Sequence, residues 1–335
     1  MTSLVTGGAG FIGSHVAEAL ARAGESVVVL DDLSGGFVEN VVGPGIVFVR
    51  GSITDTALVE QLFRTHRFDH VYHLAAYAAE GLSHFIRGHN YENNLMGSMT
   101  LINASVNHGV KVFVFTSSIA VYGQNQVPMT EAQTPRPEDP YGIAKYAVEL
   151  DLAAAHEMFG MDYVVFRPHN VYGERQNIGD RYRNVIGIFM NQILQGQPMT
   201  IFGDGQQTRA FSYISDVAPA IAESVRRPAC FNQVFNIGAD QSYSVLELAT
   251  TVAHAMGVAP NVVHLEARKE VVHAFSSHDR VRAVLGDLTG NVALDAGVAQ
   301  MAAWVQTVGA RASGKFGRIE VEKNMPASWK DIIVG

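Results

Sequence analysis

The sequence has only one cysteine, Cys230, among its 335 residues, so no disulfide can form within the chain. A chain without disulfides suits a reducing compartment, and we expect a cytoplasmic protein. The sequence also lacks an apolar run of the roughly 18–20 residues that a membrane-spanning helix needs. Because a strand-like segment begins at Ser3, there is no room for a signal peptide before it. We therefore expect no membrane partner.

Basic residues are scarcer than acidic ones, with 24 Lys and Arg against 32 Asp and Glu, which gives a formal net charge of −8. Nucleic acid is not an expected partner, because its phosphates would repel such a chain. The composition, 47% hydrophobic and 17% charged, is that of a globular protein. The length allows one large α/β unit or two closely packed domains.

Short apolar segments rich in β-branched residues alternate with segments of helical periodicity in the first half of the chain. The expected strands are residues 3–6, 26–30, 46–50, 70–74, 112–116 and 163–167, and the expected helices are residues 11–23, 54–64, 89–107 and 141–159. Strands that are apolar on both faces and joined by helices predict an α/β fold with a doubly wound parallel sheet. We expect residues 1–170 to form this domain. Residues 171–335 should form a smaller mixed α/β substrate domain, with residues near 209–240 returning to the first.

A glycine-rich turn follows the first expected strand. Gly7, Gly10 and Gly13 let the backbone turn tightly and approach a pyrophosphate, and a helix beginning at Phe11 would aim its amides at that anion. Asp31 ends the second expected strand, 18 residues after Gly13, which suits a carboxylate bound to the adenosine ribose. Because a carboxylate would repel a 2′-phosphate, the pattern favours NAD over NADP.

Tyr141 and Lys145 lie one helical turn apart at the start of an expected helix and so share a face. To act as a base near neutral pH, a tyrosine must lower its pKa from about 10 to about 7, which requires roughly 4 kcal/mol of phenolate stabilisation. A nearby ammonium and a positive nicotinamide can supply it in a water-poor pocket. Ser117 and Ser118 follow an expected strand at the carboxyl edge of the sheet, where ligands bind in such folds. We expect Ser118, Tyr141 and Lys145 to be catalytic, and Ser117 to line the nicotinamide site.

Further motifs accompany these residues: His73-Leu74-Ala75-Ala76, Asn93-Asn94 and Arg167-Pro168-His169-Asn170-Val171-Tyr172-Gly173. With them, the chain from Thr6 to about Leu285 resembles the extended short-chain dehydrogenase/reductases that act on nucleotide sugars, within the NAD-dependent epimerase/dehydratase family. It is most similar to the UDP-galactose (UDP-glucose) 4-epimerases. The resemblance implies a Rossmann domain with bound NAD, a nucleotide-sugar substrate, and a homodimer formed through helices near 89–107 and 141–159.

The resemblance also implies the residues that bind the cofactor. They are Gly7, Gly10, Phe11, Ile12, Gly13, Asp31, Asp32, Ser52, Ile53, Leu74, Ala75, Ala76, Asn94, Ser117, Tyr141, Lys145 and Pro168. Ser52 and Ile53 would lie beside the adenine, and Asn94 near the ribose or nicotinamide. The family usually has an aspartate where Ser52 stands, although a hydroxyl can still accept a hydrogen bond.

The substrate-binding residues are likewise implied by the resemblance. They are Ser118, Tyr141, Asn170, Asn184, Val185, Thr200, Ile201, Arg209 and Arg268. Arg209 and Arg268 would clasp the diphosphate through forked, charge-assisted hydrogen bonds. His169, Tyr172 and residues 78–83 are further candidates for the sugar pocket, without an assigned role.

The segment after Ser118 distinguishes the reactions of this family. Dehydratases carry Asp-Glu there and decarboxylases a glutamate, whereas this sequence has Ile119-Ala120. The resemblance therefore implies epimerisation at C4 through a transient 4-keto sugar. A nucleotide-sugar dehydrogenase, reductase or dehydratase remains an alternative, as does a non-catalytic dinucleotide-binding scaffold.

Several properties stay open at this point. The sugar could be a hexose, an N-acetylhexosamine, a uronic acid or a pentose, and the nucleotide carrier rests on analogy, as does the oligomeric state. The role of residues 310–335 is unassigned. No metal is expected, because His66, His70 and His73 do not have the spacing of metal ligands and the last two lie on opposite faces of a strand.

Overall fold

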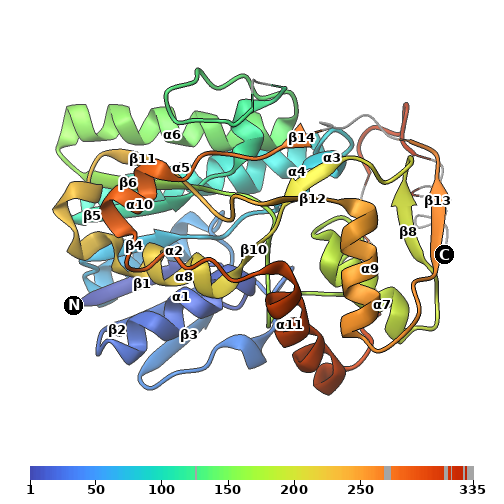
Figure 1. The fold of residues 1–335 in the computed structure, drawn as a ribbon. Coiled ribbons are helices and arrows are strands. Elements are labelled where there is room, and N and C mark those ends of the chain that lie inside the picture. Colours follow the sequence, from blue (N-terminus) through green and yellow to red (C-terminus); the bar gives the residue numbers. More distant parts are fainter. Residues whose placement is uncertain (125–126, 268–272, 313–315, 318, 327–328, 330–335) are drawn as a thin grey trace.

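The computed structural model describes residues 1–124, 127–267, 273–312, 316–317, 319–326 and 329. Its centre is a seven-stranded sheet in which all neighbouring strands are parallel (Figure 1). In spatial order the strands are β11 (Gln233–Ile237), β6 (Asp162–Pro168), β5 (Val112–Thr116), β4 (His70–His73), β1 (Thr2–Thr6), β2 (Ser26–Asp31) and β3 (Ile46–Arg50). The predicted doubly wound Rossmann sheet is confirmed.

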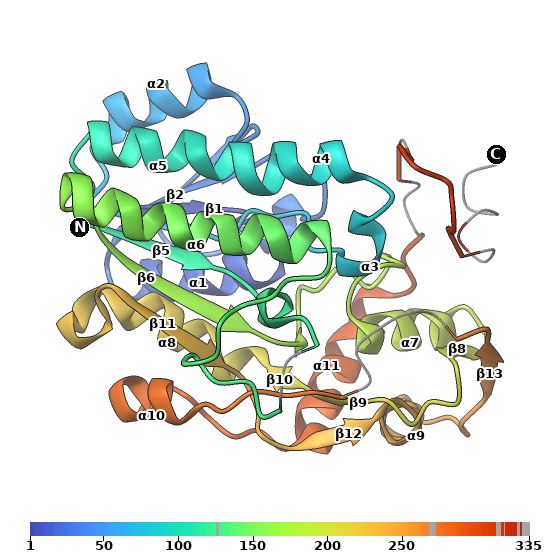
Figure 2. The same ribbon diagram turned by 90° about the horizontal axis from the view of Figure 1, so that it is seen from above.

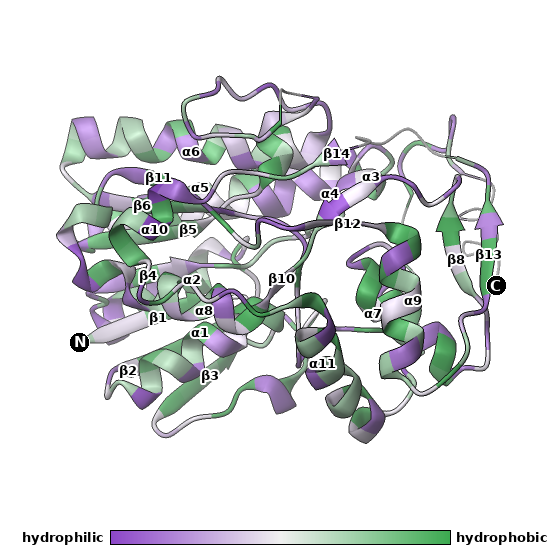
Figure 3. Cartoon of the chain, in the orientation of Figure 1, coloured by the Kyte–Doolittle hydropathy of each residue, from purple (hydrophilic) through white to green (hydrophobic). Residues whose placement is uncertain are grey.

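Helices cover both faces of this sheet (Figure 2). On one face lie α2 (Thr56–His66), α5 (Gly97–Asn107) and α6 (Pro140–Phe159), and on the other lie α1 (Phe11–Arg22) and α8 (Ala218–Glu223). Every residue of β4 and β5 is buried, as expected for strands with a helix layer on each side. The helices carry alternating apolar and polar bands (Figure 3), because each buries only one face against the sheet.

The helix predicted over residues 89–107 is interrupted. α4 (Arg87–Tyr91) runs into a π-helical turn, Glu92–Met96, before α5 begins. Asn94 lies in this turn and its side chain is bonded to the segment after β4. Its Nδ2 donates to the carbonyl of Tyr77 over 3.0 Å, and its Oδ1 accepts from the Tyr77 amide over 2.7 Å. The widened turn thus fastens the helix to the edge of the sheet where ligands bind.

The second half of the chain builds a smaller part beside the sheet (Figure 1). Its helices are α7 (Val185–Leu194), α9 (Val245–Ala255) and α11 (Leu294–Val308). Its short strands pair as β7 (Val171–Tyr172) with β10 (Ser212–Tyr213), β8 (Met199–Phe202) with β13 (Val262–Leu265), and β9 (Thr208–Ala210) with both β12 (Ser242–Ser244) and β14 (His273–Ala274). Three other elements of the second half lie on the large sheet instead: β11 is its edge strand, α10 (Asp279–Leu285) packs against β11, and α8 packs on α1. Among the described residues, no helix has the length and apolar character needed to cross a membrane.

A buried ion pair joins α6 to the sheet. Arg167 on β6 donates from Nη2 to Oε2 of Glu149 on α6 over 2.5 Å and from Nε to Oε1 over 3.0 Å, and both side chains are only 5% exposed. Ser117, at the end of β5, donates to the same carboxylate over 2.5 Å. Arg167 also donates to the Tyr122 hydroxyl, which donates in turn to Asn236 on β11. This network connects α6 with β5, β6 and β11.

Replacing Glu149 with alanine should lower the free energy of unfolding by about 3–5 kcal/mol, because Arg167 would remain buried without its counter-charge. Denaturant unfolding monitored by circular dichroism measures this change. Glu157→Ala, at an exposed position of the same helix, is the matched control and should cost less than about 0.5 kcal/mol. Equal losses in the two variants would show that the ion pair does not hold α6 in place.

Candidate active site

A cleft of about 1530 Å³ is lined by the carboxyl ends of the sheet strands and by residues of the smaller part. It brings together the residues that the sequence predicted for cofactor and substrate, with two exceptions. Asn94 does not line the cleft, because its amide is used within the fold, and its neighbour Asn93 lines it instead. Arg268 lies outside the described residues.

The glycine turn at one end of the cleft admits no larger residue. Gly7 has a φ of +69°, and a Cβ atom there would lie 2.6 Å from the Ala75 amide nitrogen. A Cβ on Gly13 would lie 2.1 Å from the Gly7 carbonyl oxygen. α1 starts directly after Gly10, and no side chain caps its N-terminus. The first amides of the helix therefore remain available to an anion in the cleft. The cradle fits the pyrophosphate of a dinucleotide.

Asp31 lines the same end of the cleft, at the last position of β2. Its carboxylate accepts hydrogen bonds from the amides of Ala9 (3.0 Å) and Leu33 (2.8 Å), which fix its orientation. Burial raises the pKa of this carboxyl, and the backbone hydrogen bonds oppose the shift. A carboxylate has about four acceptor positions, so an oriented Asp31 can still accept from the ribose hydroxyls.

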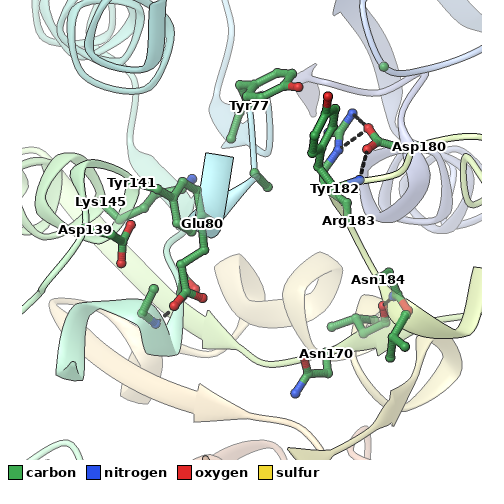
Figure 4. Close-up of a pocket in the computed structure, with 18 of the residues that line it drawn as sticks. Tyr77, Glu80, Asp139, Tyr141, Lys145, Asn170, Asp180, Tyr182, Arg183 and Asn184 are labelled. Atoms are coloured by element: carbon green, nitrogen blue, oxygen red, sulfur yellow. Dashed lines mark hydrogen bonds and ion pairs between the residues drawn. The ribbon is translucent and has the colours of Figure 1, made fainter. Parts of the chain in front are cut away.

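Tyr141 and Lys145 project from the first turns of α6. Asp139 caps this helix by accepting from the Gly142 amide over 2.9 Å, and Pro140 occupies its first position. Lys145 Nζ donates to the Thr116 carbonyl over 2.7 Å and lies 5.8 Å from the centre of the Tyr141 ring. The Tyr141 hydroxyl is hydrogen-bonded to Ser118. The three predicted catalytic side chains therefore meet at one place in the cleft, on the Tyr141 side of Figure 4.

The electrostatics of this trio differ from the sequence expectation. Burial raises the pKa of Tyr141 above its ordinary value, outweighing the hydrogen bond from Ser118, and the carboxylates of Asp139 and Glu80 act in the same direction as burial. Burial also lowers the pKa of Lys145 to about 7. The predicted lowering of the Tyr141 pKa invoked both the lysine and a bound nicotinamide, and in the protein without its ligands desolvation is the largest effect on the phenol. A permanent cation in the cleft would shift the tyrosine pKa downward.

The lowered pKa of Lys145 predicts a pH dependence of stability in the cofactor-free protein. Since the lysine titrates near pH 7 when folded and near 10.5 when unfolded, the unfolded chain binds one more proton between these values. Its contribution to the free energy of unfolding should therefore rise with pH across this window, by about 1.4 kcal/mol per pH unit. Comparing wild type with Lys145→Met at pH 7, 8 and 9 isolates this slope. A difference between them that is independent of pH would contradict the lowered pKa.

The predicted substrate residues line the other end of the cleft. Asn170 and Asn184 have positive φ angles of +40° and +57°, a conformation that asparagine adopts more readily than most residues. Asn170 donates to the Ala210 carbonyl over 3.0 Å, and Asn184 donates to the Val171 carbonyl and caps α7. Val185, Thr200, Ile201 and Arg209 also line this end. His169 lines the cleft, whereas the Tyr172 hydroxyl points away, toward the Leu294 carbonyl.

Sequence reasoning missed a group of polar residues on the walls around Tyr141. Tyr77 follows β4, and Asp180, Tyr182 and Arg183 come from the loop before α7 (Figure 4). Glu80, which lines the same cleft, is one of the residues 78–83 that were named as candidates. Arg183 is ion-paired with Asp180 over 2.5 Å and lies 5.1 Å from the centre of the Tyr77 ring. Both segments leave the carboxyl edge of the large sheet. That position was the available signal, because ligand-binding loops of such folds lie there.

A parallel sheet with this glycine turn, an acid after the second strand and a serine–tyrosine–lysine trio defines a dinucleotide-dependent enzyme of the short-chain dehydrogenase/reductase type. Residues 3–238 match the NAD dependent epimerase/dehydratase family, and the chain belongs to this family. The predictions of family and of NAD as cofactor are thereby confirmed.

Similar proteins agree with this assignment. The UDP-glucose 4-epimerase of Halalkalibacterium halodurans is 33% identical over 304 residues, which cover 85% of this chain and 90% of that protein. A crystal structure of UDP-glucose 4-epimerase with UDP-glucose from Thermotoga maritima is 35% identical with a TM-score of 0.87, covering 92% of this chain and 99% of that one. The UDP-glucuronic acid 4-epimerase of Bacillus cereus, in complex with UDP-glucuronic acid and NAD, is 28% identical with a TM-score of 0.84, covering 92% and 100%. The two solved structures share the fold of this chain but are named for different sugars, glucose and glucuronic acid.

Proposed function

We propose that this enzyme inverts the configuration at C4 of a nucleotide-activated sugar, most simply a UDP-sugar, through a transient 4-keto sugar. The observation that carries the proposal is the meeting of Ser118, Tyr141 and Lys145 in the cleft that also contains the dinucleotide cradle. The names of the relatives support the same reaction. Ile119 and Ala120, which follow Ser118, leave no carboxylate beside the serine for dehydration or decarboxylation.

The residues of this chain would act mainly through proton transfer and positioning. Ser118 receives the proton of the C4 hydroxyl and passes its own proton to the Tyr141 oxygen, because the two side chains are hydrogen-bonded to each other. Lys145, anchored to the Thr116 carbonyl, stays beside the phenol ring and supports its negative charge when protonated. NAD, when bound, accepts the hydrogen of C4 as hydride and returns it.

Inversion also requires that the sugar turn while its nucleotide stays in place. The far end of the cleft, with Asn170, Asn184 and Arg209, offers donors for a diphosphate and a nucleoside. The whole cleft has a volume of about 1530 Å³. We infer that this leaves room for the sugar to rotate about the diphosphate link beside a bound dinucleotide. Holding the nucleotide firmly then presents either face of C4 in reactive geometry.

Replacing Tyr141 with phenylalanine should reduce kcat by about 100- to 10,000-fold while the binding of NAD and UDP-sugar changes little, because only the proton acceptor is lost. Chromatographic resolution of the UDP-glucose and UDP-galactose pools measures turnover, and titration calorimetry measures binding. Tyr146→Phe, on the same helix and outside the cleft, is the matched control and should retain activity. Undiminished turnover by Tyr141→Phe would refute the assigned role.

We also propose that the enzyme is a cytoplasmic homodimer that pairs through the faces of α5 and α6. The two helices lie side by side (Figure 2). Two large exposed apolar residues lie on α6 and a third lies in the π-helical turn that precedes α5. Met96 is 59% exposed, Leu150 55% and Ile143 41%. A face of this kind is a candidate for burial against a second copy. The buried, unpaired Cys230 suits a reducing compartment.

Leu150→Lys should shift the protein from dimer to monomer, because it places a charge in the proposed apolar interface. Sedimentation velocity at several concentrations measures the mass. Val263→Lys replaces another exposed apolar residue, on the smaller part, and should leave the dimer intact. A wild-type protein that sediments as a monomer would contradict the proposal.

A further inference from the structure

Two buried histidines beside the cleft are not used by the proposed reaction. His169 follows β6 and lines the cleft, and His278 comes directly before α10. Both side chains are buried, and their Nε2 atoms lie 3.0 Å apart. Gly238 makes room for this contact, because a Cβ atom at that position would lie 2.6 Å from Nε2 of His169. The two rings therefore form one hydrogen-bonded unit, which we call the histidine pair.

Each outer end of the histidine pair meets an oxygen that accepts hydrogen bonds. Nδ1 of His169 lies 3.3 Å from the Ala210 carbonyl oxygen, and Nδ1 of His278 lies 2.7 Å from Oδ1 of Asp240. A carbonyl and a carboxylate have no proton to give, so each is satisfied only when the ring nitrogen facing it carries one. The Ser276 hydroxyl lies 3.1 Å from Nε2 of His278 and can donate to it when no proton lies between the rings. Both outer nitrogens of the pair are therefore placed as donors.

The number of protons on the histidine pair decides how many of its contacts are hydrogen bonds. The contacts at the two outer ends and the contact between the rings each need one proton. Two neutral imidazoles carry one proton each, so a neutral pair leaves two acceptors facing each other in one contact. With one further proton, the pair makes all of these hydrogen bonds and carries a positive charge, which belongs to the pair rather than to either ring. The geometry therefore has a place for one proton more than two neutral histidines hold.

The charged groups around the histidine pair come from several segments of the chain. Asp240, in the loop after β11, contacts the pair and is also ion-paired with Arg282 of α10. The side chain of Asp279, at the start of α10, is 90% exposed. Glu131 acts on the pair from the segment before α6, and β9 carries Arg209, which lines the cleft. Burial lowers the pKa of both histidines, and Asp240 opposes the shift. Without a ligand, the pair is therefore neutral near pH 7.

We propose that the histidine pair takes up one proton when a nucleotide sugar binds, and then acts as a cationic group of the substrate site. The inference rests on the proposed function, in which the diphosphate lies at the end of the cleft lined by Asn170. That asparagine follows His169 in the chain, and its amide donates to the same Ala210 carbonyl over 3.0 Å. The negative charges of a diphosphate favour the charged form of a neighbouring imidazole. The proton comes from solvent and completes the hydrogen bonds of the pair, so anion binding and proton uptake favour each other.

Titration calorimetry measures the protons that accompany binding when it is repeated in buffers of different ionisation enthalpy. The probes are UDP-glucose, UDP-N-acetylglucosamine and UDP-glucuronic acid, whose diphosphates do not titrate near neutral pH. Tyr141→Phe enzyme saturated with NAD is used, because its turnover is slow and it lacks the phenol as a second titrating group. We expect uptake of about half a proton or more per bound probe at pH 7. By linkage, Kd should then rise about threefold or more per pH unit around pH 7.

His278→Gln in the same background separates the histidine pair from Lys145 and other titrating groups of the cleft. The glutamine amide can donate to His169 without an added proton. Proton uptake should therefore fall by about half a proton, and Kd should lose most of its pH dependence. His254→Gln replaces an exposed histidine of α9 outside the cleft and should leave both quantities unchanged.

Asp240→Asn is a second variant, at a half-exposed position. It removes the negative charge beside His278, so proton uptake should require a lower pH than in the parent enzyme. Binding without proton uptake in the parent, or the same uptake in His278→Gln as in His254→Gln, would overturn the role of the histidine pair. Failure of every probe to bind would overturn the proposed function itself.

Discussion

The active site depends on the buried ion pair between Glu149 and Arg167. Glu149 lies one helical turn after Lys145 on α6, and Arg167 lies on β6, so the pair fixes the helix that carries Tyr141 and Lys145 against the strand ends that carry Ser118. Its carboxylate also accepts from Ser117, so helix and strand end share one hydrogen-bonded centre. A buried pair of this kind is costly to break, because either charge alone would remain without water. The reacting trio is therefore positioned by a rigid framework rather than by a loop, which favours the short proton path from sugar to phenol.

Much of this framework could be predicted because it follows from local patterns. Buried parallel strands such as β5 appear in the sequence as unbroken apolar segments. Positions 7 and 13 carry glycine because a Cβ atom there would collide with the backbone. Tyr141 and Lys145 share a helix face by spacing alone. The ends of strands in such a sheet converge on one edge, so residues that follow them were expected to meet. All the cofactor and substrate residues implied by the resemblance that lie in the described part of the chain, except Asn94, line one cleft, whereas the further candidate Tyr172 does not.

The features that were not predicted depend on contacts between distant segments or on burial. Asn94 was expected at the cofactor, but its amide pairs with the backbone of Tyr77 inside a π-helical turn, which sequence periodicity does not reveal. The pKa of Tyr141 is raised because desolvation outweighs the hydrogen bond from Ser118, and burial also lowers the pKa of Lys145. Asp180 and Arg183 reach the cleft from the loop before α7, where they are ion-paired with each other. These are properties of packing, and no local motif encodes them.

The account is tested most directly by following the hydrogen on C4 of the substrate. UDP-glucose deuterated at C4 is incubated with the enzyme in ordinary water, and the UDP-galactose formed is analysed by mass spectrometry and NMR. If oxidation and reduction take place within one cleft, the deuterium remains on C4 of the product with inverted configuration and does not exchange with solvent or with added NADH. Loss of the label to solvent, or its appearance in the external nucleotide pool at the rate of turnover, would contradict the account.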